Sequence, residues 1–480
     1  AMATTLADFV EEDLKRTTIM SPFQLKYSIL VGAIPLFVCG AQTLVSTFTK
    51  AVMPVMSCLR VEGATDLCVL VNSTDLVGDL CDEQHTHSWP EENLHDSVVA
   101  EFDLVCNQAW IAPAMGTGFF FGFLLGVAVF ASLADTRGRR WAFTASAGFQ
   151  LVGAAMSAAA PSAIIYAFSR FLIGASCGGM ILCGFIWNSE VVSPGARALL
   201  PSITSAMFAI GTMFVAVLYM FTHKWRALSY VMVTIDVPFI FYGCLLKESP
   251  KWYAAAGRAL DATEVLTLIS MTNKTDPPGP PPRERRTRMS MAMPGAAQSG
   301  ALKLLLCDAR LQLRFLVLCF TWFALSLGYF GLSMNVSSIG LDLSTAVLVS
   351  GATEVPVYIP LVFMLEMKLF GRRGTAMVGL LTGGMCCVFA AVAISLQEGP
   401  VRTEVLGVVF IGKAGVALAF ACIYLYAAEL FPTDLRSRAM GLQSLCSRVG
   451  GMVSPVVAEV GKSSQFLALL LFGLPALISG

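Results

Sequence analysis

Two short basic turns, one in each half of the chain, constrain the fold more than any other feature. The first reads Asp135-Thr136-Arg137-Gly138-Arg139-Arg140, the second reads Phe370-Gly371-Arg372-Arg373-Gly374, and each separates two long apolar runs. Glycine allows the sharp backbone turn, and arginines hold such a hairpin on the cytoplasmic side of a membrane. The same turn at corresponding places in two halves predicts a duplicated membrane architecture of the kind found in secondary transporters.

Composition agrees with a membrane location. The chain is 56% hydrophobic and 13% charged, about half the charged fraction of a soluble protein. Its formal net charge of +0 gives no reason to expect a nucleic-acid partner. No phosphate-binding Walker motif is present, and no nucleophile–base pair stands out. The sequence therefore predicts neither an enzyme nor a cofactor, and Cys81, His85 and His87 lack the spacing of a metal site.

The apolar runs predict an all-α membrane protein with twelve transmembrane helices, because a membrane helix needs about 20 mostly apolar residues. The expected spans are 24–49, 109–132, 142–160, 163–188, 199–221, 227–246, 313–334, 343–367, 375–396, 404–427, 439–459 and 465–480. They divide into two six-helix halves, 24–246 and 313–480. A cytoplasmic N-terminal segment, 1–23, precedes the first half, and a polar linker with a proline run and an arginine cluster, 247–312, joins the two.

Loop charges set the orientation of such a chain. Most loop arginines fall on one side if the N-terminus is cytoplasmic, so we expect both termini inside the cell and the loop 50–108 outside. Four cysteines in that loop predict two disulfides, with three possible connectivities, among Cys58, Cys68, Cys81 and Cys106. The sequence Asn72-Ser73-Thr74 predicts glycosylation of Asn72.

Three further motifs resemble those of the organic cation/anion/zwitterion carriers of the major facilitator superfamily. They are Glu101-Phe102-Asp103-Leu104-Val105-Cys106, Lys247-Glu248-Ser249-Pro250-Lys251-Trp252, and the turn from Tyr426 to Arg436. The resemblance implies two pseudo-symmetric six-helix bundles and a plasma-membrane carrier of small organic ions. We expect it to work as a monomer in the lipid bilayer.

The acids at the ends of the fourth and tenth helices, Glu190 and Glu429, lie near the arginine-bearing turns. We expect them to form ion pairs there that latch one conformation. The residues assigned to this latch are Asp135, Arg137, Arg139, Arg140, Arg170, Glu190, Arg372, Arg373, Glu429 and Arg436.

Two charged residues lie near the middle of their spans, where secondary transporters bind substrate. They are Glu354 in the eighth span and Arg448 in the eleventh. The resemblance implies that the carnitine-type branch has both an acid and a base at these positions. An ammonium group would meet Glu354 and a carboxylate would meet Arg448, unless the two charges only neutralise protein groups. Lys413 in the tenth span adds positive charge and favours anions.

Aromatic side chains near these charges can hold a quaternary ammonium through cation–π contacts. The candidates are Trp322, Tyr329, Phe330, Tyr358, Phe420 and Tyr424. The role of Asp236 in the sixth span stays open, because a buried acid beside Pro238 can also accept hydrogen bonds from a neighbouring helix.

Three functions follow from these residues. The first is a secondary transporter for cations or carnitine-like zwitterions that works by alternating access. The second is an organic-anion exchanger that uses Arg448 and Lys413. The third is a transport-inactive receptor or scaffold acting through the loop 50–108. It is suggested by the first turn, which reads Asp-Thr-Arg-Gly where the family usually has Asp-Arg-x-Gly, and by Ala131, which stands where a glycine is usual.

Overall fold

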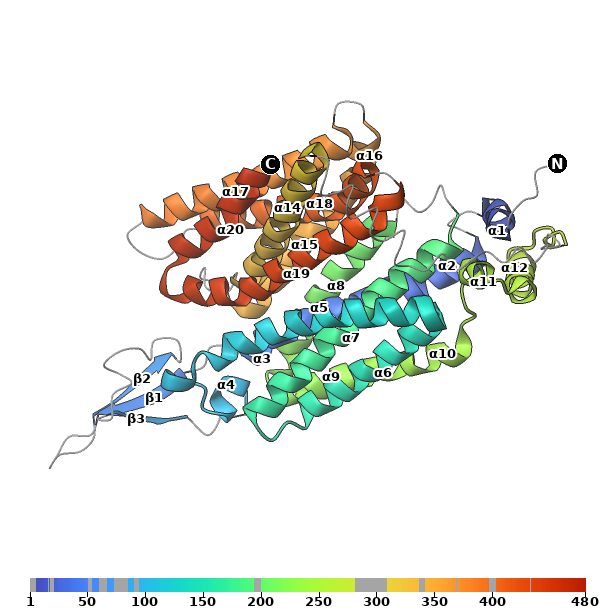
Figure 1. Cartoon of the computed structure of the whole chain (residues 1–480). Helices are drawn as coiled ribbons and strands as arrows, with labels where there is room; N and C mark the ends of the chain where they lie inside the picture. The colour runs from blue at the N-terminus through green and yellow to red at the C-terminus, as the bar shows by residue number, and fades with distance from the viewer. Residues whose placement is uncertain are drawn as a thin grey trace.

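A computed structural model describes most of the chain. The described residues are 6–15, 17, 21–50, 54–59, 67–72, 85–89, 95–193, 200–280, 309–335, 342–367, 370–396, 403–431 and 433–480. Long helices dominate and gather into two bundles that lie side by side (Figure 1). A small sheet lies at one end of the molecule, hereafter the loop end, and the turn at Gly138 lies at the opposite end, hereafter the turn end.

The first bundle holds the helices between residues 22 and 245. They are α2 (Pro22–Tyr27), η1 (Ser28–Ala33), α3 (Ile34–Thr49), α5 (Ile111–Arg137), α6 (Arg139–Ala158), α7 (Ala163–Val191), α8 (Leu200–Thr222), α9 (Trp225–Asp236), η5 (Val237–Phe241) and α10 (Tyr242–Leu245). The segments α2, η1 and α3 follow one another without a break and form the first span.

The second bundle holds the helices after residue 308. They are α14 (Ala309–Asn335), α15 (Leu343–Glu354), η7 (Val355–Val357), α16 (Tyr358–Glu366), α17 (Gly371–Ser395), α18 (Thr403–Leu430), α19 (Thr433–Ser463) and α20 (Gln465–Ser479). Each of the twelve spans expected from the sequence coincides with one of these helices or with a continuous run of them. The prediction of a twelve-helix membrane fold is confirmed.

Eight helical segments among the described residues are long and apolar enough to cross a bilayer by themselves. The other four spans have visible reasons for falling short. Helix α6 begins with two arginines, α19 carries Arg448 and Glu459, and α20 has 15 residues. The run α9–α10 carries Arg226 and Asp236 and passes through a 3-10 segment at Pro238, where proline lacks the backbone N–H that an α-helix needs.

Small residues let the helices of each bundle approach closely, as is common in membranes. A Cβ atom added to Gly126 of α5 would lie 2.0 Å from the carbonyl oxygen of Ala175 on α7. In the second bundle, a Cβ added to Gly379 of α17 would lie 2.6 Å from the carbonyl oxygen of Gly415 on α18. Neither contact has room for a side chain, so each bundle packs backbone against backbone at these points.

The two bundles touch where α5 meets α19, in the part of both helices nearer the loop end, and where α8 meets α15. At the second place, a Cβ added to Gly351 would lie 2.3 Å from the side chain of Met213. Thr117 Oγ1 donates a hydrogen bond to the carbonyl oxygen of Met452 at 3.0 Å. A Cβ added to Gly451 would lie 2.7 Å from the ring of Phe120, and the Phe120 ring lies 4.7 Å from that of Phe330 on α14. These contacts close the space between the bundles toward the loop end.

The loop end carries an antiparallel sheet that the sequence did not predict. Its strands are β1 (Pro54–Leu59), β2 (Leu67–Asn72) and β3 (His85–Ser88), in the order β2-β1-β3. Cys58 stands opposite Cys68 in the register of β1 and β2. Cys106 forms a disulfide, whereas Cys81 lies outside the described residues. The oxidation of Cys58, Cys68 and Cys81 and the glycosylation of Asn72 stay predictions.

At the turn end, three short helices cover the first bundle. They are α1 (Leu6–Lys15), α11 (Pro250–Ala255) and α12 (Ala259–Asn273). Helix α1 buries Leu6, Val10 and Leu14 and pairs Glu11 with Lys251 of α11. The first part of the expected linker is therefore helical and docked on the first bundle.

Glu101, the last residue of α4 (Val98–Glu101), fastens the loop to the membrane helices. Its carboxylate accepts hydrogen bonds from Trp225 Nε1 at 2.9 Å and from Arg226 Nε at 3.1 Å. Arg226 also donates to the carbonyl oxygens of Ala158 and Ala160, at 3.0 and 2.9 Å. One arginine thus ties the loop to the connection between α6 and α7.

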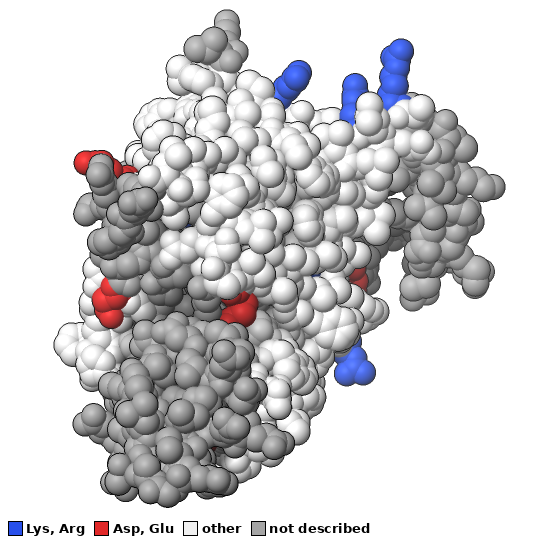
Figure 2. Space-filling model, turned by 90° about the vertical axis from the view of Figure 1, so that its left-hand side faces the viewer, with Lys and Arg blue, Asp and Glu red and all other residues white. Residues whose placement is uncertain are grey.

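Seen from the loop end, charged side chains stand singly among uncharged ones on the described surface (Figure 2).

This anchor predicts an acid-sensitive loop. Burial raises the pKa of Glu101, but the hydrogen bonds from Arg226 and Trp225 and the charge of Arg226 outweigh it, so the pKa is lowered. Such a group contributes stability above its ordinary pKa of about 4.3 and loses it as the pH falls through the lowered value. We expect Glu101→Gln to lower the unfolding temperature of the purified protein near neutral pH, and the difference from the parent to shrink in acid.

The exposed Glu404 provides the control, because Glu404→Gln removes a carboxylate that carries no such anchor. An unfolding temperature of Glu101→Gln that stays below the parent by the same amount at every pH would contradict the role of the ionised carboxylate.

Candidate functional site

A cavity of about 190 Å³ lies between the two bundles. Residues of α3, α5, α7 and α8 form its wall on one side, and residues of α14, α16, α18 and α19 form the other. Its lining extends toward the turn end through Phe185, Ser205 and Ser444. Toward the loop end, the contact of Thr117 and Phe120 with α19 covers it.

Most of the aromatic residues predicted for the site do line the cavity. Tyr329, Phe330, Tyr358, Phe420 and Tyr424 form its wall on the second bundle. The structure does not bring Trp322 to this wall. Its ring packs 4.4 Å from that of Tyr424 and its side chain is fully buried, so it supports the wall from behind.

The facing wall contains aromatic residues that the sequence analysis did not select. Phe120, Phe123 and Phe208 reach the cavity from α5 and α8. The Phe119-Phe120-Phe121 run and Phe123 were visible in the sequence, but their helix has apolar side chains all round. Only the packing of α5 against α19 shows which of these rings face the second bundle.

Arg448 lines the cavity from the middle of α19. Its guanidinium carbon lies 4.0 Å above the ring of Phe123, a cation–π distance, and its side chain also contacts Tyr424. Its Nε has no hydrogen-bond partner, although the atom is buried. Among the described residues, no carboxylate lies within ion-pair distance of this guanidinium.

Glu354 and Lys413 do not face the cavity as the sequence analysis expected. Lys413 Nζ lies 2.6 Å from Glu354 Oε1, and the two side chains are 3% and 0% exposed. Tyr329 donates its hydroxyl hydrogen to Glu354 Oε2 at 2.9 Å, and Lys413 donates to Ser350 Oγ. The two charges therefore neutralise each other behind Tyr329, which stands between them and the cavity.

The charge of the cavity follows from these two arrangements. Of the described residues that line it, Arg448 is the only charged one. The pair of Glu354 and Lys413 adds no net charge. The cavity thus presents one positive group within a largely aromatic and aliphatic wall.

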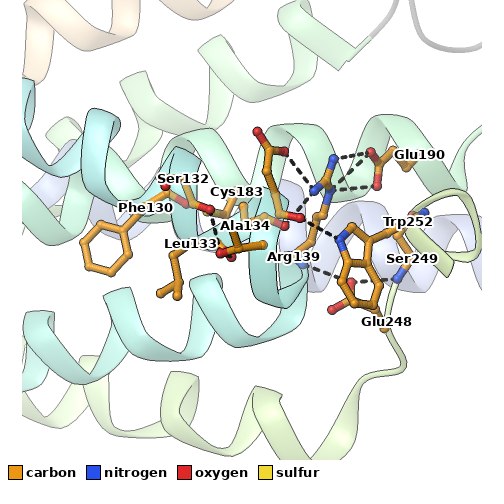
Figure 3. A network of polar contacts seen from close by, with 12 residues as sticks. Phe130, Ser132, Leu133, Ala134, Arg139, Cys183, Glu190, Glu248, Ser249 and Trp252 are labelled. Carbon is orange, nitrogen blue, oxygen red and sulfur yellow. Dashed lines mark hydrogen bonds and ion pairs between the residues drawn. The ribbon is translucent and has the colours of Figure 1, made fainter. Parts of the chain in front are cut away.

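The first basic turn gathers a network of polar contacts at the turn end (Figure 3). Arg139 lies 3.1 Å from Asp135 and 3.1 Å from Glu190 on α7, and its Nη1 donates to the carbonyl oxygen of Ala134 at 2.6 Å. Arg137 is exposed. The structure therefore brings Asp135, Arg139 and Glu190 together as expected, and their conformational role stays a prediction.

Glu248 is the part of this network that the sequence analysis missed. Its carboxylate accepts the backbone N–H groups of Arg139 at 3.1 Å, Arg140 at 3.0 Å and Ser249 at 2.8 Å. Gly138 adopts φ +106°, and a Cβ there would lie 2.2 Å from Glu248 Oε2. Burial raises the pKa of Glu248 above its ordinary value, and the three N–H groups offset that effect only in part. Glu248 belongs to the motif from Lys247 to Trp252, but that motif does not show that its carboxylate caps the first basic turn.

The second basic turn is simpler. Arg372 Nε lies 2.6 Å from Glu429 Oε1, and both side chains are about half exposed. Arg373 is exposed, and the side chain of Arg436 lies outside the described residues. Surface pairs of this kind contribute about 0–1 kcal/mol, so the second turn is held more weakly than the first.

The assignment of Arg170 to the latch is wrong. Arg170 lies near the start of α7, and Glu190 lies near its end, which places them about 30 Å apart along the helix. Arg170 is fully buried and donates to the backbone oxygen of Gln42 at 2.5 Å. Asp236 accepts hydrogen bonds from Gln42 and Gln150, at 3.0 and 3.1 Å, as one of the open alternatives foresaw.

Comparisons with known proteins agree with this architecture. A family model described as "Sugar (and other) transporter" matches residues 93–465. The chain belongs to this family of the major facilitator superfamily. Within it, "Solute carrier family 22 member 13" of Homo sapiens is 31% identical over 82% of this chain and 69% of the relative. "Solute carrier family 22 member 6" of Bos taurus is 30% identical over 84% and 73%.

A more distant likeness shows the fold alone. The proton:xylose symporter XylE bound to 6-bromo-6-deoxy-D-glucose superposes with a TM-score of 0.63 at 12% identity, covering 96% of this chain and 95% of XylE. Together with the family match, this makes the chain a major facilitator secondary transporter and not an enzyme.

The buried pair predicts a specific pattern of stability. Glu354→Gln should leave the Lys413 ammonium buried without a carboxylate, which costs about 3–5 kcal/mol. The double variant Glu354→Gln/Lys413→Met removes both charges and should recover most of the stability, because apolar groups of similar volume replace a buried pair at little cost. Unfolding temperature and membrane yield measure both effects. A single variant as stable as the parent would contradict the pair's structural role and return Glu354 to the substrate site.

The capping role of Glu248 predicts a second difference. Glu248→Gln offers one acceptor oxygen in place of two, so an N–H of the first turn loses its partner at a cost of about 1–3 kcal/mol. We expect a lower unfolding temperature and slower transport. Glu264→Gln is the matched control, since it breaks only the exposed pair with Lys247. Equal effects of the two substitutions would show that the turn does not depend on this cap.

Proposed function

We propose that this transporter carries small organic anions, with the acidic group of the substrate on Arg448. The observation that supports the proposal is the charge of the cavity. Arg448 is the one charged residue among the described residues that line it, and Lys413 holds Glu354 in an ion pair away from the wall. A buried cation without a counter-ion attracts an anion, which compensates its charge.

The chemistry of Arg448 suits a carboxylate. A guanidinium presents its N–H donors in a planar fork that matches the two oxygens of a carboxylate. The ring of Phe123 beneath it leaves the N–H edge of the guanidinium for a ligand, and its buried Nε has no partner. A bound carboxylate would supply the acceptor that this atom lacks.

The rest of the wall suits an aromatic or aliphatic substrate body. Tyr329, Phe330 and Phe420 on one side face Phe120 and Phe208 on the other. Rings of this kind bury large apolar area and stack on planar ligands. We therefore favour amphipathic anions, such as aromatic carboxylates, over strongly hydrated inorganic ones.

The preference for cations or carnitine-like zwitterions loses its main support. That hypothesis needs a carboxylate in the cavity wall, and Glu354 is instead shielded by Tyr329 and neutralised by Lys413. A zwitterion retains one favourable contact, its carboxylate on Arg448, while its ammonium would rely on the tyrosine rings. We place the carrier in the plasma membrane on the family resemblance, with its turn end in the cytoplasm on the loop charges of the sequence.

An uptake panel tests the proposal. Cells expressing the protein receive labelled benzoate, tetramethylammonium or glycine betaine, which differ in charge. Arg448→Ala should lower the apparent affinity for benzoate by roughly tenfold or more, since a hydrogen bond to a charged group is worth about 1.5–3 kcal/mol. Arg448→Lys keeps the charge but not the planar fork of N–H donors. Its apparent affinity for benzoate should fall between those of the parent and Arg448→Ala. Arg448→Asp should favour the simple cation.

Arg314→Ala removes an exposed arginine of α14 and should leave uptake unchanged. Uptake of tetramethylammonium alone by the parent would overturn the anion assignment. Uptake of none of the three by a protein that reaches the surface would favour the receptor hypothesis.

A further inference from the structure

A second set of buried charges lies within the first bundle, behind the cavity wall. Asp236 is 1% exposed, and its two oxygens accept hydrogen bonds from Gln42 Nε2 on α3 and Gln150 Nε2 on α6. Among the described residues, no lysine or arginine lies within ion-pair distance of this carboxylate. Transport of an anion on Arg448 makes no use of it.

Arg170 lies on the other side of Gln42. Its Nη2 donates to the backbone oxygen of Gln42 at 2.5 Å and its Nη1 lies 3.5 Å from Gln42 Oε1. Its Nε is buried without a partner. One side-chain amide therefore separates a buried cation from a buried carboxylate, with its N–H side on the acid and its oxygen on the base.

We propose that Asp236 is a proton-binding site and that the amide of Gln42 passes its protonation state to Arg170. Hydronium gives its proton to one carboxylate oxygen and leaves as water. The new O–H is a donor and needs an acceptor, yet both neighbouring amides present N–H groups to it. One of the two amides must turn over to offer its oxygen.

Gln42 is the amide that turns. The oxygen of Gln150 faces two donors, Ser176 Oγ at 2.7 Å and Cys177 Sγ at 3.4 Å, and the Ser176 hydroxyl also lies 2.7 Å from the carbonyl oxygen of Ile173. Among the described residues, Arg170 makes the one contact with the oxygen of Gln42, and it is long, at 3.5 Å. When Gln42 turns, its NH₂ group faces the guanidinium, and two donors that face each other repel. Arg170 then loses its contact with the side chain of Gln42 and keeps the hydrogen bond to the Gln42 backbone oxygen.

The surroundings favour a proton over a metal cation. Hard cations are held by several oxygen ligands, whereas the groups nearest Asp236 present N–H donors. The helices packed against α9 also carry Cys39 on α3, Arg139 and Arg140 at the turn end of α6, and Tyr219 near the loop end of α8. Arg170 and Cys177 lie on α7, beyond Gln42 and Gln150. Cys177 donates to Gln150 Oε1 at 3.4 Å, and Cys39 contacts the backbone of Cys177, so neither thiol supplies a cation ligand.

A continuous set of contacts leads from Arg170 to the closure between the bundles. The guanidinium carbon lies 5.1 Å from the ring of Phe119, and the Phe119 and Phe120 rings are 5.3 Å apart. Phe120 packs on Phe330 and Gly451 of the second bundle. The closed loop end occurs here with Gln42 donating to Asp236, the arrangement for an ionised acid. Proton binding therefore favours an open loop end.

The test measures loop-end opening directly and does not depend on which substrate is carried. Thr117 lies under Met452 in the closed contact, so Thr117→Cys places a thiol that opening exposes. The purified Thr117→Cys protein and its Asp236→Asn derivative are labelled in nanodiscs with a hydrophilic maleimide from about pH 5 to about pH 8. Both carry the same thiol, so the ratio of their labelling rates cancels the thiol's own pH dependence.

We expect the two proteins to label alike in acid. As the pH rises, the labelling rate of the Thr117→Cys protein should fall below that of the Asp236→Asn derivative. The ratio of the two rates should change by up to about tenfold per pH unit, the limit for one proton. Asp276→Asn changes an exposed acid of the linker. Placed in the Thr117→Cys protein, it should leave the labelling rate unchanged at every pH. If Asp236→Asn does not fold, Gln42→Met replaces it and should likewise label fast at every pH.

A rate ratio that stays constant with pH would overturn the proposal. A ratio that changes when sodium replaces potassium at constant pH would overturn the choice of the proton as the ligand.

Discussion

The ion pair between Lys413 and Glu354 decides what the cavity can hold. Each charge alone would be costly at this depth in a bilayer, and together they form a neutral unit that Tyr329 covers. If the pair were absent, Arg448 and Glu354 would give the wall one charge of each sign. Because the pair is present, Arg448 is the only charged residue among the described ones that line the cavity. The substrate preference that we propose thus depends on a contact that the substrate does not touch.

The sequence was sufficient for the fold because membrane helices are determined locally. Apolar length and arginine-bearing turns predicted twelve spans, and each coincides with a helix or a continuous run of helices. Tyr329 and Phe330 of α14 and Phe420 and Tyr424 of α18 were also found, since they lie on second-half helices near the charged residues. The sheet β1–β3 was missed, because its short strands lie in a polar loop without a clear alternation.

The pairing of charges was harder to predict, because it depends on contacts between helices far apart in the sequence. Lys413 was assigned to anions and Glu354 to cations, and only the packing of α15 against α18 shows that they face each other. Glu248 caps a turn more than a hundred residues away. The error over Arg170 was avoidable, since the predicted topology already placed it and Glu190 at opposite ends of one helix.

The lone positive charge of the cavity also has an electrical consequence. With a monovalent anion on Arg448, the loaded site is neutral, whereas the empty site carries one charge through the membrane. Membrane voltage acts on a moving charge by about 2.3 kcal/mol for every ~100 mV. The voltage would therefore bias the return of the empty carrier more than the passage of the loaded one. A cell's resting potential would then change the rate of transport mainly through the unloaded protein.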